Sequence, residues 1–183
     1  MATRYRFGES HVPHFVTTSV INWVDALSRP VYKDIVINSL KYCIDKKNLV
    51  VHAWVIMNNH IHMVISAKER APLADIMRDF KKHTAKELLE AIDTPGESRR
   101  SWMMWLFSSA GRNNPNNERY QFWQQDNHPI MLTSGAEIQQ KIDYVHDNPV
   151  RAGIVYKAEE YKYSSAFDYY TQQQGLLPIE MLI

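Results

Sequence analysis

The chain has 183 residues, of which 45% are hydrophobic and 22% charged, as in an ordinary soluble globular protein of one domain. Its formal net charge of +1 gives no chain-wide support for nucleic-acid binding. The single cysteine, Cys43, excludes an internal disulfide framework and favours a reducing cytoplasm. No apolar run approaches the ~18 residues of a membrane span, and the amino terminus lacks a signal-peptide hydrophobic region.

Charge is distributed unevenly along the chain. Residues 78–86 carry four basic side chains against one acid, and residues 99–119 carry four against one, so each segment has a net charge of +3. Such segments favour an anion-facing surface, although a solvated helix face would have the same composition. The basic residues considered for DNA binding are Arg78, Lys81, Lys82, Arg99 and Arg100.

The first predicted elements are a strand and a helix. Residues 14–21 are rich in β-branched side chains, which predicts a strand. Ser28 is the expected N-cap of the following helix, with Pro30 in its first turn.

A β-hairpin is expected next, with strands at about residues 49–57 and 60–66. The connecting pair is Asn58-Asn59, and asparagine tolerates positive φ better than other non-glycine residues, which suits a two-residue turn.

The second hairpin strand carries two histidines. Side chains on a strand repeat their face every two residues, so His60 and His62 share one face while Ile61 and Met63 point towards a core. Two imidazoles on a rigid strand can hold one divalent cation. A core or surface histidine pair has the same pattern, so the motif alone leaves both interpretations open.

The middle of the chain is expected to begin with a helix opened by Pro72, whose apolar stripe faces a core. A short helix is predicted at residues 101–109, a polar loop at 111–117 and a strand at 120–125. Aromatic residues of this region either stack on unpaired bases or fill a small core of their own. They are Trp102, Trp105 and Phe107.

A second informative segment runs from Ser134 to Pro149. Ser134 and Glu137 form a capping box that marks a helix start, and Pro149 is expected to end the helix. Ile142 and Val145 should face the core.

Another face of this helix carries Tyr144 and Asn148, one turn apart, with Lys141 beside them. An exposed tyrosine and a C-terminal asparagine would explain the pair. Beside a His-x-His strand, the pair is also typical of a nucleophile and a third metal ligand. His146 turns ~200° away from Tyr144 on a helix and is left out of the ligand set.

With these motifs the chain resembles the single-tyrosine HUH transposases, and within them the REP-associated tyrosine transposases of the IS200-like superfamily. The resemblance rests on His60-Ile61-His62 followed by a Tyr-x3-Asn-Pro-Val-x-Ala-Gly run that starts at Tyr144. It extends over about residues 14–170. The second motif is the more specific of the two.

The resemblance implies an α+β ferredoxin-like sandwich, with an antiparallel sheet of four or five strands and helices packed on it. The whole chain, 1–183, would form one catalytic domain with a C-terminal extension from about residue 150. The implied activity is metal-dependent nicking and rejoining of single-stranded DNA through a covalent 5′-phosphotyrosine. Tyr144 carries over as the nucleophile, and His60, His62 and Asn148 carry over as metal ligands.

The residues agree with this chemistry. Mg²⁺ or Mn²⁺ on the histidines would neutralise charge on phosphate oxygens, whereas cysteine ligands would favour structural zinc. A tyrosine, with an ordinary pKa of ~10, needs help to ionise, and Lys141 or the cation could provide it. The implied partner is a palindromic DNA hairpin with a flanking guide sequence, and the expected location is the cytoplasm, at the nucleoid. Whether the chain forms a homodimer is left open.

Two other functions remain open from the sequence. A phosphoesterase would use the same histidines with water as the nucleophile. A non-catalytic module derived from a transposase would bind single-stranded nucleic acid through its sheet and aromatic residues.

Overall fold

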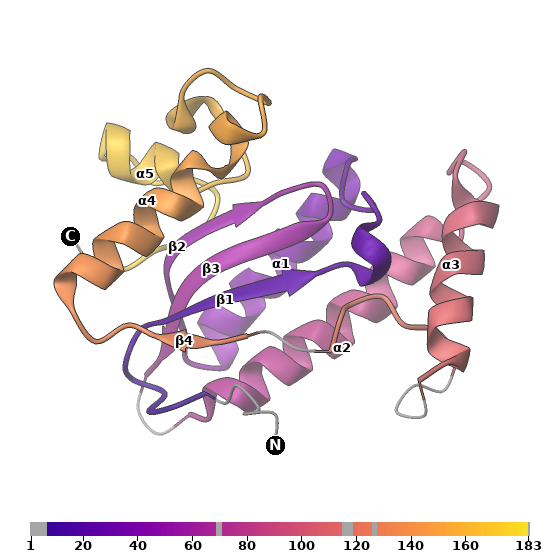
Figure 1. Ribbon diagram of the computed structural model, residues 1–183, viewed down its shortest axis with the longest axis horizontal. Helices are drawn as coiled ribbons and strands as arrows, with labels where there is room; N and C mark the ends of the chain where they lie inside the picture. The colour runs from indigo at the N-terminus through magenta and orange to yellow at the C-terminus, as the bar shows by residue number, and fades with distance from the viewer. Residues whose placement is uncertain (1–6, 69–70, 115–118, 126–127, 183) are drawn as a thin grey trace.

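The computed structural model describes residues 7–68, 71–114, 119–125 and 128–182 (Figure 1). Its strands are β1 (His14–Ser19), β2 (Leu49–Ile56), β3 (His60–Ala67) and β4 (Ile130–Met131). The helices are α1 (Pro30–Lys46), α2 (Leu73–Ile92), α3 (Arg100–Arg112), α4 (Gly135–Arg151) and α5 (Ala166–Thr171). Two 3₁₀ turns, η1 (Ile21–Trp23) and η2 (Ala158–Glu160), complete the set.

The strands form one antiparallel sheet in the order β2-β3-β1-β4. The predicted α+β fold with a sheet of four or five strands is therefore confirmed, with four strands among the described residues. Strand β3 lies in the centre and pairs with both β2 and β1. In the β1–β3 register, Thr17 lies opposite His62 and Ser19 opposite His60.

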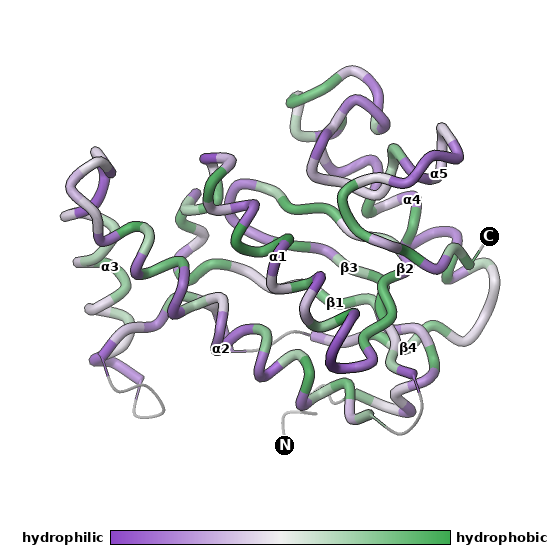
Figure 2. Tube along the Cα trace, turned by 180° about the vertical axis from the view of Figure 1, so that it is seen from behind, coloured by the Kyte–Doolittle hydropathy of each residue, from purple (hydrophilic) through white to green (hydrophobic). Residues whose placement is uncertain are grey.

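Helices cover the two faces of the sheet unequally. Helices α1 and α2 lie side by side behind the sheet in Figure 1 and in front of it in Figure 2. Helix α4 lies on the other side, against β2 and β3. Ile61, Met63 and Ile65 are fully buried, as the two-residue alternation of β3 predicts. Figure 2 shows hydrophobic residues along the strands.

The hairpin between β2 and β3 has the predicted two-residue loop, but the reason differs. Neither Asn58 nor Asn59 has a positive φ. Tertiary hydrogen bonds hold the turn instead, because the Asn58 carbonyl accepts from Leu27 N and the Asn59 carbonyl accepts from Val20 N, both at 2.8 Å. The Lys33 ammonium donates to Asn58 Oδ1 at 3.0 Å.

Two predicted features outside the hairpin need correction. Ser28 is not the N-cap of α1, because the helix begins one residue later, with Arg29 as N-cap and Pro30 in the first turn.

Residues 120–125 do not form a strand. They run extended beside the end of β1, with one bridge between Trp123 and Val20, and Gln124 N donates to Ser19 O at 2.8 Å. The predicted loop at 111–117 begins inside α3, and residues 115–118 lie outside the described residues.

Helix α4 starts as predicted and ends later. The capping box is present, with Glu137 N donating to Ser134 Oγ at 3.3 Å and Ser134 N donating to Glu137 Oε2 at 3.1 Å. Pro149 does not end the helix but lies inside its last turn. The end is a Schellman motif, in which Gly153 has a φ of +70° and Ile154 N donates to Pro149 O at 2.9 Å.

The C-terminal part of the chain covers the outer edge of β2. Ile56 N donates to Tyr163 O and Ser165 N donates to Trp54 O, both at 2.9 Å, and Glu180 N donates to Val51 O farther along the strand. These bonds pair backbone groups that an open edge strand would leave exposed. Within the described ranges, no helix combines the length and the apolarity needed to cross a bilayer.

The capping box makes a measurable contribution to stability. We expect Ser134→Ala to lower the free energy of unfolding by ~1 kcal/mol, because the helix loses a side-chain acceptor for a free N–H group. Urea denaturation would measure the change. Ser101→Ala, at an exposed position in α3, is the control and should stay within ~0.5 kcal/mol of the wild type. Equal stabilities of the two variants would contradict the assignment.

Candidate functional site

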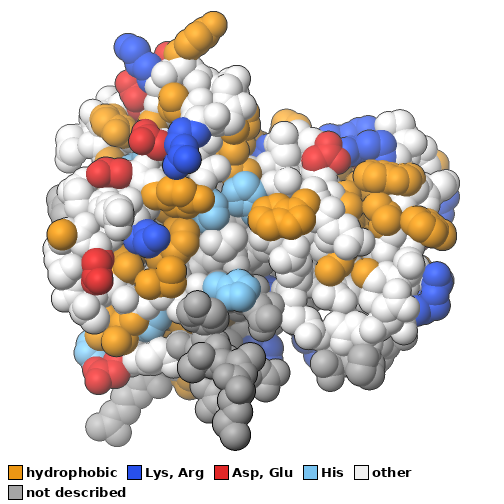
Figure 3. All heavy atoms as spheres, viewed as in Figure 1, with side chains coloured by type: hydrophobic (Ala, Val, Ile, Leu, Met, Phe, Trp, Pro, Cys, Tyr) orange, Lys and Arg blue, Asp and Glu red, His pale blue; other side chains and the backbone are white. Residues whose placement is uncertain are grey.

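His60 and His62 lie at the beginning of β3, on the sheet face that α4 partly covers. His60 is half-buried and His62 is only 6% exposed. Their ring centroids are 4.5 Å apart, with an interplanar angle of 65°. In Figure 3, histidine side chains reach the surface near the centre of this face. The strand therefore presents two adjacent imidazoles at the edge of solvent.

An oxygen atom contacts the Nδ1 atom of each histidine. Asn59 Oδ1 lies 2.6 Å from His60 Nδ1, and Thr17 Oγ1 lies 2.8 Å from His62 Nδ1. An amide oxygen only accepts, so His60 Nδ1 carries the hydrogen in this arrangement, and the threonine hydroxyl can accept in the same way. Each ring then keeps its Nε2 lone pair available, which is the usual arrangement of histidines that bind metals.

Both histidines are held in the neutral form. Burial, followed by electrostatic repulsion between a protonated His62 and both His60 and Lys141, lowers the pKa of His62 to about 3. Burial also lowers the pKa of His60, although a hydrogen bond with the Asn148 side chain opposes the shift. Neutral imidazole is the form that binds a cation, so the site needs no deprotonation near pH 7.

Tyr144 projects from α4 towards the same face. Its side chain is 37% exposed, and its ring centroid lies 5.1 Å from that of His62 and 5.8 Å from that of Phe15. Lys141 Nζ lies 5.8 Å from the Tyr144 ring centroid and 4.8 Å from that of Phe15. The helix thus places an accessible phenol and an ammonium group directly beside the histidine pair.

Asn148, one turn after Tyr144, reaches His60 with its side chain. The structure therefore brings together the five residues that the sequence had selected, namely His60, His62, Lys141, Tyr144 and Asn148. In the part of the chain that is described, no group of three His, Cys, Asp or Glu side chains is arranged for a metal. The donor set here is instead two imidazoles and one amide.

Four residues of this site were not found from the sequence: Phe15, Thr17, Asn59 and Arg151. Phe15 and Thr17 share a face of β1, but only the pairing of β1 with β3 places that face next to His62. Arg151 could have been found, because it is seven residues after Tyr144, about two helical turns. Its guanidinium carbon lies 5.7 Å from the Tyr144 ring centroid.

A protein-family model described as "Transposase IS200 like" matches residues 13–110, which is more than half of the chain. The chain belongs to this family. The matched segment contains the histidine pair and ends before Tyr144. A sequence comparison with curated proteins gave no match.

Two solved structures resemble this member of the IS200-like transposase family. A REP-associated tyrosine transposase bound to a REP hairpin superposes with a TM-score of 0.68 at 14% identity, over 100% of this chain and 94% of the other. At that identity, the likeness shows the fold. A structure described as a candidate transposase from Deinococcus radiodurans R1 gives a TM-score of 0.46 at 15% identity, over 77% and 98% of the two chains.

Three of the five selected basic residues of this transposase-family chain line one groove. Arg78, Lys81 and Lys82 project from α2 into a groove of about 610 Å³ whose opposite wall is the extended segment 120–125. Arg78 pairs with Asp75 at 2.6 Å, and Lys81 Nζ donates to Gln124 O at 2.6 Å. The groove therefore combines positive charge with the aromatic residues of its wall, which are Tyr120, Phe122 and Trp123.

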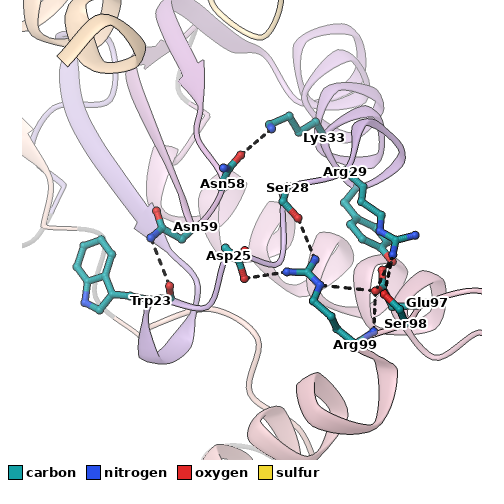
Figure 4. A network of polar contacts seen from close by, with 11 residues as sticks. Trp23, Asp25, Ser28, Arg29, Lys33, Asn58, Asn59, Glu97, Ser98 and Arg99 are labelled. Atoms are coloured by element: carbon teal, nitrogen blue, oxygen red, sulfur yellow. Dashed lines mark hydrogen bonds and ion pairs between the residues drawn. The ribbon is translucent and has the colours of Figure 1, made fainter. Parts of the chain in front are cut away.

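Arg99 and Arg100 do not line that groove. Arg99 belongs to a network around Glu97, whose side chain is only 1% exposed (Figure 4). Arg99 Nη1 lies 2.8 Å from Asp25 Oδ1, and Tyr32 donates to Glu97 at 2.6 Å. Burial opposes ionisation of Glu97, yet the Tyr32 hydrogen bond and the nearby guanidinium groups leave its pKa below the ordinary value. Arg100 pairs with Asp93 at the surface, at 2.6 Å.

The aromatic residues of α3 divide into two groups. Phe107 is fully buried against Phe122, with ring centroids 4.9 Å apart, and so fills the core. Trp102 and Trp105 are 50% and 62% exposed. Hydrophobic side chains accordingly gather on the surface over α3 in Figure 3.

His146, which the sequence analysis excludes from the ligand set, is buried. One of its ring nitrogens, Nε2, lies 2.9 Å from Ser165 Oγ, away from the histidine pair.

The two arginines should differ in their contribution to stability. Arg99→Ala removes one of the cationic partners of a buried carboxylate, and we expect it to lower the free energy of unfolding by ~2 kcal/mol. Arg100→Ala removes an exposed ion pair and should cost less than ~0.5 kcal/mol. Urea unfolding of both variants checks this expectation. A larger loss for Arg100→Ala would show that the Glu97 network does not stabilise the fold.

Proposed function

We propose that this chain cuts and rejoins single-stranded DNA, with Tyr144 as the nucleophile. The observation that carries the proposal is the contact between the exposed Tyr144 ring and His62, at 5.1 Å on the open face of the sheet. A phenol needed only for packing would not have to be exposed beside two neutral imidazoles. Membership of the IS200-like transposase family supports the same reading.

The histidine pair and Asn148 fit a divalent cation. The amide oxygen suits Mg²⁺ or Mn²⁺, imidazole nitrogen is a ligand for divalent transition metals, and the oxygen contacts of both Nδ1 atoms direct both Nε2 atoms towards a ligand. We propose that His60, His62 and Asn148 hold this ion. When bound, such an ion acts as a Lewis acid that neutralises charge on non-bridging phosphate oxygens.

The covalent step belongs to the chain's own residues. Tyr144 Oη forms a bond to phosphorus as the bond from phosphorus to the 3′ oxygen breaks. The phenolic proton passes to solvent, and the leaving 3′ oxygen takes up a proton. The products are a 5′-phosphotyrosine and a free 3′-hydroxyl. Rejoining is the reverse reaction, in which a 3′-hydroxyl attacks the phosphotyrosine and releases Tyr144.

Two cations help Tyr144 to react. Lys141 Nζ and the Arg151 guanidinium lie 5.8 and 5.7 Å from its ring centroid, so positive charge surrounds the phenol. Such charge attracts the phosphate backbone and stabilises the negative charge that develops during transfer. We assign Lys141 and Arg151 to this supporting role.

The proposed substrate is a DNA hairpin with an unpaired flank. The transposase in the superposed structure is bound to a REP hairpin, and the groove lined by Arg78, Lys81 and Lys82 combines basic and aromatic side chains, as sites for unpaired strands do. We propose that this groove contacts the flank. Arg99 and Arg100 are expected to contribute less, because both are engaged in ion pairs outside the groove.

The nucleophile assignment has a direct test. Tyr144→Phe removes one oxygen and keeps the ring, so hairpin binding should remain while the DNA adduct that survives denaturation disappears. The assay is electrophoresis of the protein after incubation with labelled single-stranded hairpin oligonucleotides and Mn²⁺. The oligonucleotides are taken from palindromes beside the gene.

Tyr156→Phe is the matched control, because Tyr156 is 96% exposed and should keep full activity. Cleavage without an adduct in the wild type would identify a phosphoesterase that uses water. Binding without cleavage in the wild type would identify a nucleic-acid-binding module. An adduct formed by Tyr144→Phe would place the nucleophile elsewhere.

Metal binding can be measured without DNA. Mn²⁺ should raise the melting temperature of the wild type in a saturable way, equivalent to ~2.7 kcal/mol at one hundred times Kd. His60→Ala should remove this shift, whereas His83→Ala, at an exposed position on α2, should keep it. Because burial lowers the pKa of His62 to about 3 and that of His60 below its ordinary value, the shift should weaken less between pH 7.5 and 6 than it would with two ordinary histidines. An unchanged shift in His60→Ala would refute the site.

A further inference from the structure

Trp23 lies beside the histidine pair and is unusually exposed for its size. Its side chain is 57% exposed, and its ring centroid lies 6.0 Å from that of His60, with the two rings at 72°. The ring therefore contacts the site through an edge, and much of its surface remains in solvent. An exposed aromatic face next to a phosphate-binding site can stack a nucleotide base.

The backbone at Trp23 adopts a conformation that bulky residues avoid. Asn22 and Trp23 have φ values of 53° and 56°, both in the left-handed region. A bulky side chain at positive φ is strained, and such strain persists only where surrounding contacts enforce it. Here Trp23 N donates to Val20 O at 3.1 Å, and Asn59 Nδ2 donates to Trp23 O at 3.3 Å.

Asn59 links this strained turn to the histidine pair. Its Nδ2 donates to the Trp23 carbonyl, as Figure 4 shows, and its Oδ1 contacts His60 Nδ1 at 2.6 Å. One side chain therefore fixes the position of Trp23 and the orientation of His60 together. The tryptophan has a defined place relative to the site rather than being an unrelated surface residue.

Four rings of the site contact one another in a series that begins with Tyr144 and ends with Trp23. Tyr144 contacts His62 at 5.1 Å, His62 contacts His60 at 4.5 Å, and Trp23 contacts His60 at 6.0 Å. The nucleophile lies at one end and the tryptophan at the other. In phosphoryl transfer, the attacking and leaving oxygens are roughly in line on opposite sides of phosphorus. A leaving 3′ oxygen therefore points away from Tyr144, and Trp23 is the ring of this series that is most contacts removed from Tyr144.

We propose that Trp23 stacks on the base of the nucleotide immediately 5′ of the cleaved bond, the one that keeps the 3′-hydroxyl. This inference rests on the proposed use of Tyr144 as nucleophile for its direction along the strand. Stacking holds the 3′-hydroxyl at the site after cleavage, ready for rejoining. Because every base has an aromatic face, the contact selects a position on the strand more than a particular base.

The test uses stacking as a readout that needs no cleavage. Hairpin oligonucleotides carry 2-aminopurine either directly 5′ or directly 3′ of the cleavage position, and the protein carries Tyr144→Phe. Stacking on Trp23 quenches 2-aminopurine fluorescence, so quenching is expected for the 5′ probe. Trp23→Leu, which keeps bulk without an aromatic ring, should remove most of this quenching. Trp23→Phe should retain it.

Covalent adduct formation by the protein with Tyr144 intact is the second readout. Trp23→Leu should slow it about tenfold, a size that matches the loss of one stacked base. Trp105→Leu is the control, since Trp105 is 62% exposed on α3 and should affect neither readout. Melting curves with Mn²⁺ show that the variants keep the fold and the histidine site.

The outcomes separate the two proposals. If Trp23→Leu leaves the 5′ quenching and the adduct rate unchanged, or if only the 3′ probe is quenched, the role of Trp23 is overturned while Tyr144 can still be the nucleophile. If quenching of the 5′ probe depends on Trp23 but the wild type forms no adduct, Trp23 is a base-stacking residue and the proposed nicking reaction fails.

Discussion

The candidate site depends on the register between β1 and β3. This register places Thr17 opposite His62, so that a threonine hydroxyl lies 2.8 Å from His62 Nδ1. A shift of one residue would turn Phe15 and Thr17 to the other face of the sheet and remove both from the histidines. The same shift would bring Val16, which is fully buried, out of the core. Core burial therefore protects the geometry of the site.

The site needs a neutral, buried imidazole at His62 next to a phenol that solvent can reach. Burial removes the imidazole from water and holds it neutral, with a pKa of about 3, while the neighbouring phenol remains accessible. A charged histidine pair at a separation of 4.5 Å would repel both a cation and itself. The fold avoids this by burying one ring and leaving the other half-buried, beside the exposed Tyr144 of α4.

The sequence predicts local features better than the contacts between distant segments. The burial of Ile61, Met63 and Ile65 in β3, the apolar stripe of α2 and the capping box at Ser134 depend on nearby residues, and all three are confirmed. The neighbours of the histidines depend on strand pairing, which is not visible in residue spacing. Arg99 shows the same limit, because its spacing in the sequence does not reveal that Glu97 and Asp25 contact its guanidinium in the fold. Local periodicity cannot reveal a buried carboxylate 65 residues from the tyrosine that donates to it.

Helix α4 continues past Pro149, although a proline usually ends a helix, and this continuation positions residues of the candidate site. A proline disfavours helix at the residue before it, so Pro149 was expected to end the helix. Had it done so, Asn148 and Arg151 would have lost the helical positions that align them with Tyr144. The Schellman motif at Gly153 instead satisfies the last carbonyls and extends the helix through Arg151. Asn148 then lies ~40° from Tyr144 around the helix and Arg151 lies ~20° from it, so one face carries the phenol, the amide and the guanidinium together.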